Sequence, residues 1–407
     1  MGTSPAGEFC GAEIIGIPLL NGPAEFTDFY PVPVQFTSAP KRLSKPGDIL
    51  FCVRGSTTGR MNWSDQEYAI GRGLAAISHK SGSEYNHFLR YLLENNLNSL
   101  LNNTNGSTFP NLTRDLLAGF IFTIPDLGGQ KKISALFKSV DTKIELNNRI
   151  NAELEAMAKT LYDYWFVQFD FPDTNGKPYK TSGGKMVYNP TLKREIPKGW
   201  EVSTLARWIK SDKTGDWGKE SPEGNYTLQV DCIRGADING INGNGKINTP
   251  NRFILQKNEH KLLEPFDLVI EISGGSPTQS TGRMAFITDD VLERFSHPII
   301  CSNFCKAISL HDNDLLYCFT YLWDSLYSNG VLFGWEGKTS GIKNLLFDAF
   351  VNKYHVPLPP KHLAKQFFEF AAPLERKKQT LLKENVKLES LRDWLLPMLM
   401  NGQVTVK

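Results

Sequence analysis

Two stretches of the sequence place an arginine at the end of a loop that is rich in Gly, Ser and Thr. The first, GDILFCVRGSTTGRM, runs from Gly47 to Met61, and the second, FDLVIEISGGSPTQSTGRM, runs from Phe266 to Met284. In each, an apolar run predicts a β-strand that fixes the root of the loop, and the glycines allow close backbone approach. An arginine held in this way can clamp a phosphate, contact a base edge, or pair with a carboxylate of its own domain.

Other polar and basic residues gather in loops of both halves of the chain. Arg and Lys neutralise phosphates and read guanine edges, Asn and Gln read adenine, and Ser and Thr serve both purposes. Surface loops are generally polar, so the hypothesis of DNA contact depends on the collective pattern and not on any single residue. The candidate DNA-binding residues are Lys41, Arg42, Arg54, Ser56, Thr57, Thr58, Arg60, Asn103, Asn105, Ser107, Thr108, Asn242, Asn244, Lys246, Arg252, Ser276, Thr278, Gln279, Ser280, Arg283, Lys338, Thr339, Ser340 and Lys343.

Motifs of catalysis are matched only in part. Gly240, Gly245 and Lys246 approximate a phosphate-binding loop, but Ile247 stands where a Ser or Thr metal ligand belongs. The chain contains no Gly-x-Ser-x-Gly elbow and no His-Glu-x-x-His motif. We therefore expect no catalytic residues.

Two further patterns resemble a nuclease site and a zinc site. Acidic and Lys residues after Pro125 imitate a nuclease, but two of them, Asp141 and Lys143, fall on a predicted long helix and not on converging strands. Two cysteines lie between two histidines at spacings that fit no familiar zinc module; these are Cys301, Cys305, His297 and His311. We expect no metal site.

Composition indicates a globular chain with two or three domains. The chain has 407 residues, of which 41% are hydrophobic and 22% charged, and its net charge is +2. A basic surface must therefore be local. Six scattered cysteines, together with the lack of a signal peptide or a long apolar run, predict a reduced, cytoplasmic protein without a membrane segment.

Two long heptad patterns follow the two arginine loops along the chain. They predict helices that pair with each other as a coiled coil, since apolar residues recur at alternating steps of four and three. The alternative is two amphipathic helices that pack on unrelated domain cores. The predicted pairing residues are Ile133, Phe137, Val140, Ile144, Asn151, Leu154, Leu161, Leu374, Leu381, Asn385, Leu388 and Leu395.

The chain also repeats at the segments before these helices. PNLTRDLLAGFIFTIP, from Pro110 to Pro125, is similar to KNLLFDAFVNKYHVPLP, from Lys343 to Pro359. Each globular unit combines short β-runs with one or two helices, so the predicted class is α+β. The repeat implies two similar globular units, each followed by a long helix.

The order of these parts resembles the DNA specificity subunits of Type I restriction–modification systems. The resemblance rests on KPGDILFCVRGSTTGR, on IPKGWEVSTLARW, and on the helical phrase that begins at Ile124 and contains IELNN. It implies two target-recognition domains, two long antiparallel helices as a spacer, and an approximate two-fold axis. The implied boundaries are 1–126 and 200–360 for the recognition domains, 127–168 and 361–407 for the spacer helices, and 169–199 for a linker.

The resemblance also implies a function and partners. Such subunits recognise a bipartite site in double-stranded DNA, dock what are expected to be two methyltransferase subunits, and are joined by restriction and translocase subunits. S-adenosylmethionine and ATP with Mg are expected on those partners, and no cofactor is expected in this chain. A helix of the predicted length, about 50 Å, exceeds one duplex turn.

One departure from the family pattern concerns the first domain. The Trp-containing opening phrase occurs only before the second domain, so we expect a truncated or tagged N-terminus. Two alternatives stay open, a specificity region with its own methyltransferase or nuclease activity, and a coiled-coil scaffold that binds no DNA. An Asn-Pro-Pro-Tyr-type tetrapeptide is missing, since Asn189-Pro190 continues with Thr191, and this disfavours the first alternative.

Overall fold

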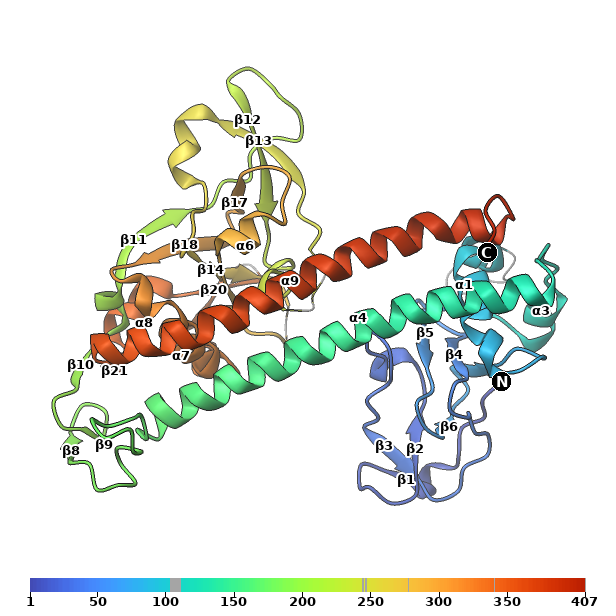
Figure 1. Cartoon of the computed structure of the whole chain (residues 1–407), viewed down its shortest axis with the longest axis horizontal. Coiled ribbons are helices and arrows are strands. Elements are labelled where there is room, and N and C mark those ends of the chain that lie inside the picture. The colour runs from blue at the N-terminus through green and yellow to red at the C-terminus, as the bar shows by residue number, and fades with distance from the viewer. Residues whose placement is uncertain (103–110, 244, 246, 277, 340, 407) are drawn as a thin grey trace. The chain divides into compact units, whose positions relative to one another are not determined.

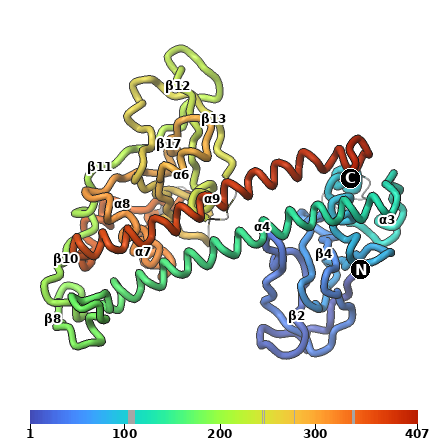
Figure 2. The backbone as a smooth tube through the Cα atoms, in the orientation of Figure 1, coloured from blue at the N-terminus to red at the C-terminus, as the bar shows by residue number. Residues whose placement is uncertain are grey.

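The chain forms two compact units that share two long helices. The computed structural model spans residues 1–407 and describes all of them except 103–110, 244, 246, 277, 340 and 407. The first unit comprises residues 1–146 and 385–407, and the second comprises residues 147–384. Both units contain parts of α4 (Leu127–Tyr162) and α9 (Lys361–Met400), each of which is a continuous coil in Figure 2. The predicted α+β class with two long helices is confirmed.

The described residues of the first unit form two small sheets. One has four strands in the order β1-β3-β2-β6, and the other has three in the order β5-β4-β7. The central strand β4 is fully buried because all four of its residues are apolar. The strands are β1 (Cys10–Gly11), β2 (Ile17–Leu20), β3 (Gln35–Thr37), β4 (Ile49–Cys52), β5 (Met61–Trp63), β6 (Ala69–Ile70) and β7 (Leu74–Ile77).

Among the described residues, three short α-helices precede α4 in the first unit. They are α1 (Asn86–Asn95), α2 (Leu97–Asn102) and α3 (Arg114–Gly119). Helix α1 buries Phe88, Tyr91 and Leu92, which share one face because they are three and four residues apart. The hydroxyl of Thr113 accepts a hydrogen bond from the Leu116 amide at 3.3 Å, which caps α3.

The second unit is built mainly from strands. Its largest sheet has the order β11-β18-β14-β16, and two three-stranded sheets have the orders β13-β12-β17 and β15-β20-β19. The strands are β10 (Glu201–Thr204), β11 (Ile209–Thr214), β12 (Tyr226–Ile233), β13 (Asn251–Leu255), β14 (Leu268–Glu271), β15 (Ser273–Gly274), β16 (Met284–Phe286), β17 (Ile299–Cys301), β18 (Cys305–Leu310), β19 (Glu336–Thr339), β20 (Ile342–Leu345) and β21 (His355–Leu358).

The helices of this unit include the buried α7, beside the strands in Figure 1. They are α5 (Ile238–Asn242), α6 (Asp289–Leu292), α7 (Leu316–Ser328) and α8 (Phe347–Lys353). The segment predicted as a linker is folded here, since β8 (Met186–Asn189) pairs with β9 (Arg194–Pro197) and buries Ile196. Strand β10 pairs with β21 in a further two-stranded sheet.

Within each unit, the two long helices run antiparallel. In the first unit, Ile133 and Phe137 near the start of α4 share a buried cluster with Leu399 near the end of α9. In the second unit, Tyr162 at the end of α4 packs against Phe367 near the start of α9, with ring centres 5.9 Å apart and ring planes tilted by 58°. No helix in the described part of the chain combines the length and the apolar composition that crossing a membrane requires.

The predicted pairing residues all lie on buried or half-buried faces of these helices. Ile133, Phe137, Val140, Ile144, Asn151, Leu381 and Asn385 are buried, and Leu154, Leu161, Leu374, Leu388 and Leu395 are half-buried. Polar side chains also enter this seam: the Asn147 amide donates to the Glu384 carboxylate at 2.9 Å. A polar seam residue lowers stability but fixes the register of a helix pair.

Candidate nucleic-acid interface

The two arginine loops connect equivalent pairs of strands. Strand β4 lies between β5 and β7, and β14 lies between β16 and β18, with all of these neighbours antiparallel. In the first unit the loop leaves β4 and returns as β5, and in the second it leaves β14 and returns as β16. The sequence repeat therefore corresponds to a repeat in three dimensions.

Backbone hydrogen bonds place the two arginines at the same position. The Cys52 amide donates to the Arg60 carbonyl at 2.8 Å, and the Glu271 amide donates to the Arg283 carbonyl at 2.8 Å. Each arginine is thus the last residue of its loop, opposite the last residue of a buried strand. Cys52 and Glu271 are the equivalent residues on those strands.

A glycine with a positive φ precedes each arginine. Gly59 has a φ of 96° and Gly282 a φ of 106°. A Cβ at Gly59 would lie 2.5 Å from a methyl carbon of Leu97, and one at Gly282 would lie 2.6 Å from a methyl carbon of Leu332. Both loops therefore need glycine for the backbone conformation and for the space.

The second repeated segment also occupies equivalent positions. The Leu112 amide donates to the Val53 carbonyl at 2.9 Å, and the Leu345 amide donates to the Ile272 carbonyl at 2.8 Å. These bonds attach each segment to the first residues of its arginine loop. Leu112 and Leu345 therefore occupy equivalent positions in the two similar segments.

In the first unit, the arginine loop presents its basic side chains to solvent. Arg54 and Arg60 are exposed. The Arg60 guanidinium donates to the Pro23 carbonyl at 3.4 Å. Within the described residues, neither Arg54 nor Arg60 forms an ion pair with a carboxylate. The loop is closed by its own short bonds, such as that from the Thr58 hydroxyl to the Gly55 carbonyl at 2.7 Å. Both guanidinium groups can reach an external acceptor.

In the second unit, the equivalent arginine is held internally. The Arg283 guanidinium donates to both oxygens of the Glu271 carboxylate, at 2.9 and 2.8 Å. Its side chain is 16% exposed and that of Glu271 is 8% exposed. This hydrogen bonding raises the pKa of Arg283. Arg283 thus takes the alternative role, pairing with a carboxylate of its own domain.

A second buried carboxylate fixes the rest of this loop. Glu336 accepts hydrogen bonds from the amide and the hydroxyl of Thr281, at 2.7 and 3.1 Å. Lys343 pairs with Glu336 at 3.5 Å and donates to the Gln279 carbonyl at 3.3 Å. The Trp323 indole donates to the Gly282 carbonyl at 2.7 Å. The tip of the loop, which includes Thr278 and Gln279, remains exposed.

Two other candidates in the second unit have structural partners. The Arg252 guanidinium lies 4.0 Å from the centre of the Trp217 ring and donates to Glu220 at 3.0 Å. Asn242 exchanges hydrogen bonds with the backbone of Phe286, at 3.0 and 2.8 Å. These side chains stabilise the domain, and contact with DNA stays a prediction for them.

The remaining candidates differ in exposure. Lys41, Arg42 and Ser56 are exposed, Thr57, Ser276 and Ser280 are half-buried, and Thr58 is buried. Asn103, Asn105, Ser107, Thr108, Asn244, Lys246 and Ser340 lie outside the described residues. Lys338 and Thr339 belong to β19 by their backbone.

The residues that imitated catalytic or metal sites have local partners. Asp126 accepts a hydrogen bond from the Gly129 amide at 2.8 Å in the first turn of α4. The Cys301 thiol donates to the Cys305 carbonyl at 3.8 Å, and burial raises the pKa of Cys305 to about 12. Across the described ranges, no three metal-ligating side chains come together.

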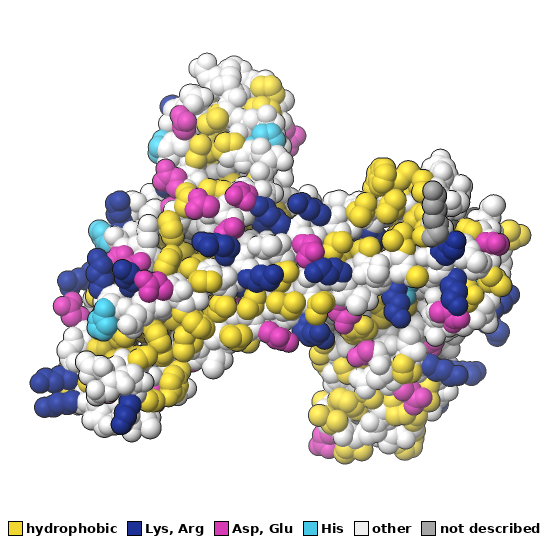
Figure 3. Space-filling model, in the orientation of Figure 1, with side chains coloured by type: hydrophobic (Ala, Val, Ile, Leu, Met, Phe, Trp, Pro, Cys, Tyr) yellow, Lys and Arg dark blue, Asp and Glu magenta, His cyan; other side chains and the backbone are white. Residues whose placement is uncertain are grey.

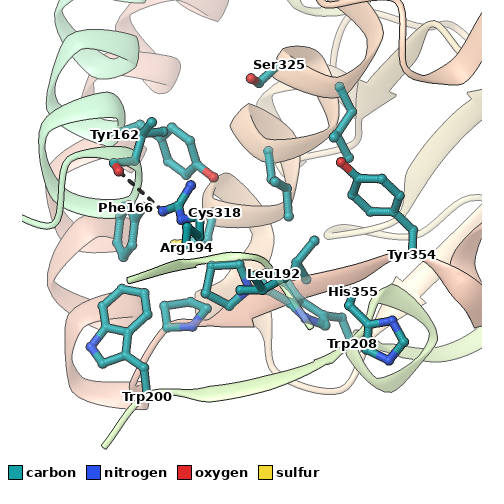
Figure 4. A pocket seen from close by; sticks show the side chains of 16 residues that line it. Tyr162, Phe166, Leu192, Arg194, Trp200, Trp208, Cys318, Ser325, Tyr354 and His355 are labelled. Atoms are coloured by element: carbon teal, nitrogen blue, oxygen red, sulfur yellow. Dashed lines mark hydrogen bonds between the residues drawn. The ribbon is translucent and has the colours of Figure 1, made fainter. Parts of the chain in front are cut away.

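A pocket of about 270 Å³ lies in the second unit where α4 ends. Figure 4 shows its walls, which include Tyr162, Trp200 and Trp208. Arg194 reaches from β9 toward the end of α4, and its guanidinium donates to the Val167 carbonyl at 3.4 Å. The lining residues include none of the candidate DNA-binding residues. The pocket is therefore separate from the arginine loop.

Charged side chains of both signs occupy the molecular surface. On the face shown in Figure 3, Lys and Arg side chains are interspersed with acidic and apolar ones. This agrees with the net charge of +2. A basic surface must then be local, as at the exposed Arg54 and Arg60.

Comparisons with known proteins all find similarity to specificity subunits of Type I restriction–modification systems. Residues 30–156 match the family model of the Type I restriction modification DNA specificity domain. The chain is 25% identical over 378 residues to the Type I restriction enzyme MjaIX specificity subunit of Methanocaldococcus jannaschii, covering 90% of this chain and 79% of that protein. It is 32% identical over 161 residues to the putative type I restriction enzyme MjaX specificity subunit of the same organism, covering 40% of this chain and 38% of that protein.

A solved structure agrees in fold. The crystal structure of the Type I restriction-modification S subunit from M. genitalium superposes with a TM-score of 0.56 at 16% identity, covering 98% of this chain and 92% of that one. The matched family model contains the first arginine loop and most of α4, and the same strand arrangement recurs in the second unit. Residues 30–156 therefore carry a Type I restriction modification DNA specificity domain, and most of the chain is similar to a Type I restriction enzyme specificity subunit.

Proposed function

We propose that this specificity subunit recognises a bipartite target in double-stranded DNA, with one arginine-loop domain for each half. The observation that carries the proposal is the duplicated strand and loop, with Arg60 and Arg283 at the same backbone position. A single site would need one reader, whereas two equivalent readers suit two half-sites. DNA sequence recognition is the role of the family; the division into halves is our proposal.

The two domains would use different side chains for recognition. In the first domain, Arg54 and Arg60 are exposed and supply positive charge. In the second, the arginine is paired with Glu271, so the polar tip with Thr278 and Gln279 offers the exposed hydrogen-bonding groups. Arginine suits guanine or phosphate, and Gln suits adenine. The half-sites would then differ in how strongly their recognition depends on salt.

The long helices would dock methyltransferase subunits, which we expect to number two. Helix α9 exposes large apolar side chains: Val386 is 53%, Leu391 46% and Trp394 63% exposed. Exposed aromatic and apolar residues of this kind are frequent in protein interfaces. If Trp394 lies in the interface, Trp394→Ala should weaken co-elution with the methyltransferase subunit, and the exposed neighbour Lys387→Ala should not. Equal co-elution of both variants would contradict this role for α9.

Chemistry would belong to the partners. We propose that this chain is non-catalytic, that S-adenosylmethionine is bound by the methyltransferase subunits, and that ATP and Mg are used by restriction and translocase subunits. The chain incubated alone with S-adenosylmethionine and DNA should transfer no methyl group. Methylation by the isolated chain would contradict the proposal.

Binding to designed duplexes tests the bipartite target. The complex with methyltransferase subunits would be titrated with a cognate duplex, with duplexes in which one half is scrambled, and with duplexes whose central spacer is scrambled. We expect either scrambled half to weaken binding and a scrambled spacer of unchanged length to have little effect. A target that tolerates loss of one complete half would contradict two-domain recognition.

A further inference from the structure

A second turn lies beside each arginine loop, and we call it the adjacent turn. In the first unit it comprises residues 71–73 and joins β6 to β7, and in the second it comprises residues 302–304 and joins β17 to β18. The sequence after each turn contains Ala-Ile-Ser, at residues 76–78 and 307–309. The turn is therefore a further part of the repeat that contains the arginine loop.

The same backbone hydrogen bonds fix both adjacent turns. The Leu74 amide donates to the Gly71 carbonyl at 3.1 Å, and the Cys305 amide donates to the Ser302 carbonyl at 2.9 Å. The amide of the first residue of each turn donates at 2.8 Å to the carbonyl that ends the neighbouring strand, β2 or β12. The two turns thus have equivalent positions between their sheets.

Each adjacent turn is bonded to the start of its arginine loop. The Val53 amide donates to the Gly73 carbonyl at 2.9 Å, and the Ile272 amide donates to the Phe304 carbonyl at 2.9 Å. The Ser273 amide also donates to the Phe304 carbonyl, at 3.1 Å. Val53 and Ile272 directly follow β4 and β14, so the third residue of each turn lies next to the first residues of the loop.

The two units differ in this third residue. A Cβ at Gly73 would lie 2.4 Å from the Asn21 carbonyl oxygen, so the first unit has no room for a side chain there. In the second unit, Phe304 is 50% exposed, although Ser302 and Cys305 are each 1% exposed. Buried neighbours therefore hold an exposed phenylalanine beside the second arginine loop.

The position of Phe304 suits contact with a thymine. Single exposed apolar residues are common on protein surfaces, so exposure alone indicates nothing. Phe304 differs because its carbonyl is bonded to two residues of the arginine loop, and a turn fixed in this way needs little ordering on binding. In the major groove, the C5 methyl group of thymine is apolar and is contacted by side chains such as Phe. The exposed Asn303 precedes it, and an Asn amide can bind the adenine of an A·T pair.

We propose that Phe304 is a specificity-determining residue of the second domain and packs against the C5 methyl group of a thymine in its half-site. The inference rests on the proposed recognition of one half-site by each domain, and it adds a residue outside the arginine loop. The first domain makes no equivalent contact, because Gly73 occupies that position.

Replacement of thymine by deoxyuridine tests the contact because it removes only the methyl group. The complex with methyltransferase subunits would be titrated with the cognate duplex and with duplexes in which each thymine is replaced in turn. We expect one replacement to weaken binding by the wild-type chain about four-fold, which corresponds to about 0.8 kcal/mol for one buried methyl group. The same replacement should not weaken binding by Phe304→Ala.

Matched variants control for other effects of the substitution. Phe304→Leu retains an apolar side chain and should bind the cognate duplex more tightly than Phe304→Ala. Tyr188→Ala removes an aromatic side chain that is 61% exposed on β8, and it should respond to deoxyuridine as the wild-type chain does. Circular dichroism checks that each variant is folded.

The outcomes separate this inference from the proposed function. The role of Phe304 would be overturned by a target without thymine, by wild-type binding that no deoxyuridine weakens, or by an equal loss in Phe304→Ala and wild type at every thymine. If a scrambled half still weakens binding in those cases, recognition by two domains stands without Phe304. If the complex tolerates loss of one complete half, the proposed function itself fails.

Discussion

The two arginine loops join equivalent strands, and the buried residue that lies opposite the arginine differs between them. In the first unit, Cys52 lies opposite Arg60, and the arginine is exposed. In the second unit, Glu271 takes that position and binds Arg283 through both carboxylate oxygens. The same loop arginine is thus free to meet a ligand in one domain and is a structural element in the other. A buried residue of the adjoining strand can therefore determine whether a loop side chain is exposed to solvent.

The largest expected effect is on stability and concerns Arg283. Arg283→Ala would leave Glu271 buried without its partner, and this should destabilise the strands around β14 by about 3–5 kcal/mol. Arg60→Ala removes an exposed side chain and should change stability by less than about 0.5 kcal/mol. Hydrogen exchange of the β14 and β4 amides measures both local stabilities. Equal protection losses in the two variants would remove the difference between the loops.

For DNA affinity, we expect Arg60→Ala to have a larger effect than Arg283→Ala. Arg60→Ala should cost about 1–3 kcal/mol at cognate DNA if the guanidinium contacts a base, or reduce the salt slope by about one if it contacts a phosphate. Titrations of the assembled complex at several salt concentrations distinguish these cases. Arg149→Ala, at an exposed position on α4, is the control. If affinity, sequence preference and salt slope are all unchanged in Arg60→Ala, this loop does not contact DNA.

Both loops have a glycine with a positive φ before the arginine, and substitution of these glycines tests whether that conformation is required. Gly59→Ala and Gly282→Ala should each cost about 1–3 kcal/mol because φ is positive and a leucine occupies the space. Gly55 also has a positive φ, of 89°, but no atom lies within 4 Å of its added Cβ. Gly55→Ala should therefore cost less than Gly59→Ala in thermal or urea unfolding. An equal cost would show that the contact with Leu97 is unimportant.

The smallest effect on DNA binding is expected from neutralising Glu271, the carboxylate that pairs with Arg283. Glu271→Gln retains a hydrogen-bond acceptor for Arg283 but removes the negative charge. Non-specific DNA binding should become slightly tighter, and the salt slope should steepen by no more than about one. Glu369→Gln, at an exposed position on α9, controls for the change in net charge. Weaker binding by Glu271→Gln than by this control would argue that the ion pair organises the DNA surface.

Sequence patterns predicted the features that depend on local periodicity. The heptads predicted α4 and α9, and the shared Gly-Arg-Met ending identified strands that prove equivalent in β4 and β14. The fully apolar ILFC and the nearly apolar LVIE are short runs whose burial follows from their composition. Periodic and repeated patterns of this kind can be recognised in a sequence without knowledge of contacts between distant residues.

Features that depend on distant contacts could not be predicted in the same way. The second loop is held by Glu336, 55 residues after Thr281, and by Trp323, 41 residues after Gly282, and no local pattern relates these residues to the loop. Glu271 offered a signal, since a carboxylate that ends a buried strand needs a cationic partner. The folded β8–β9 hairpin likewise arose from a Gly- and Pro-rich segment that indicated a linker.

The most direct test of two-domain recognition is the sequence motif that the assembled system methylates. Methylome sequencing would compare hosts that carry the partner subunits with the wild-type chain, with the Arg60→Ala chain, and with a chain in which Thr278 and Gln279 are both replaced by Ala. The account predicts a wild-type motif of two defined halves separated by undefined bases, with each variant relaxing a different half. An undivided motif, or the same half relaxed by both variants, would contradict it.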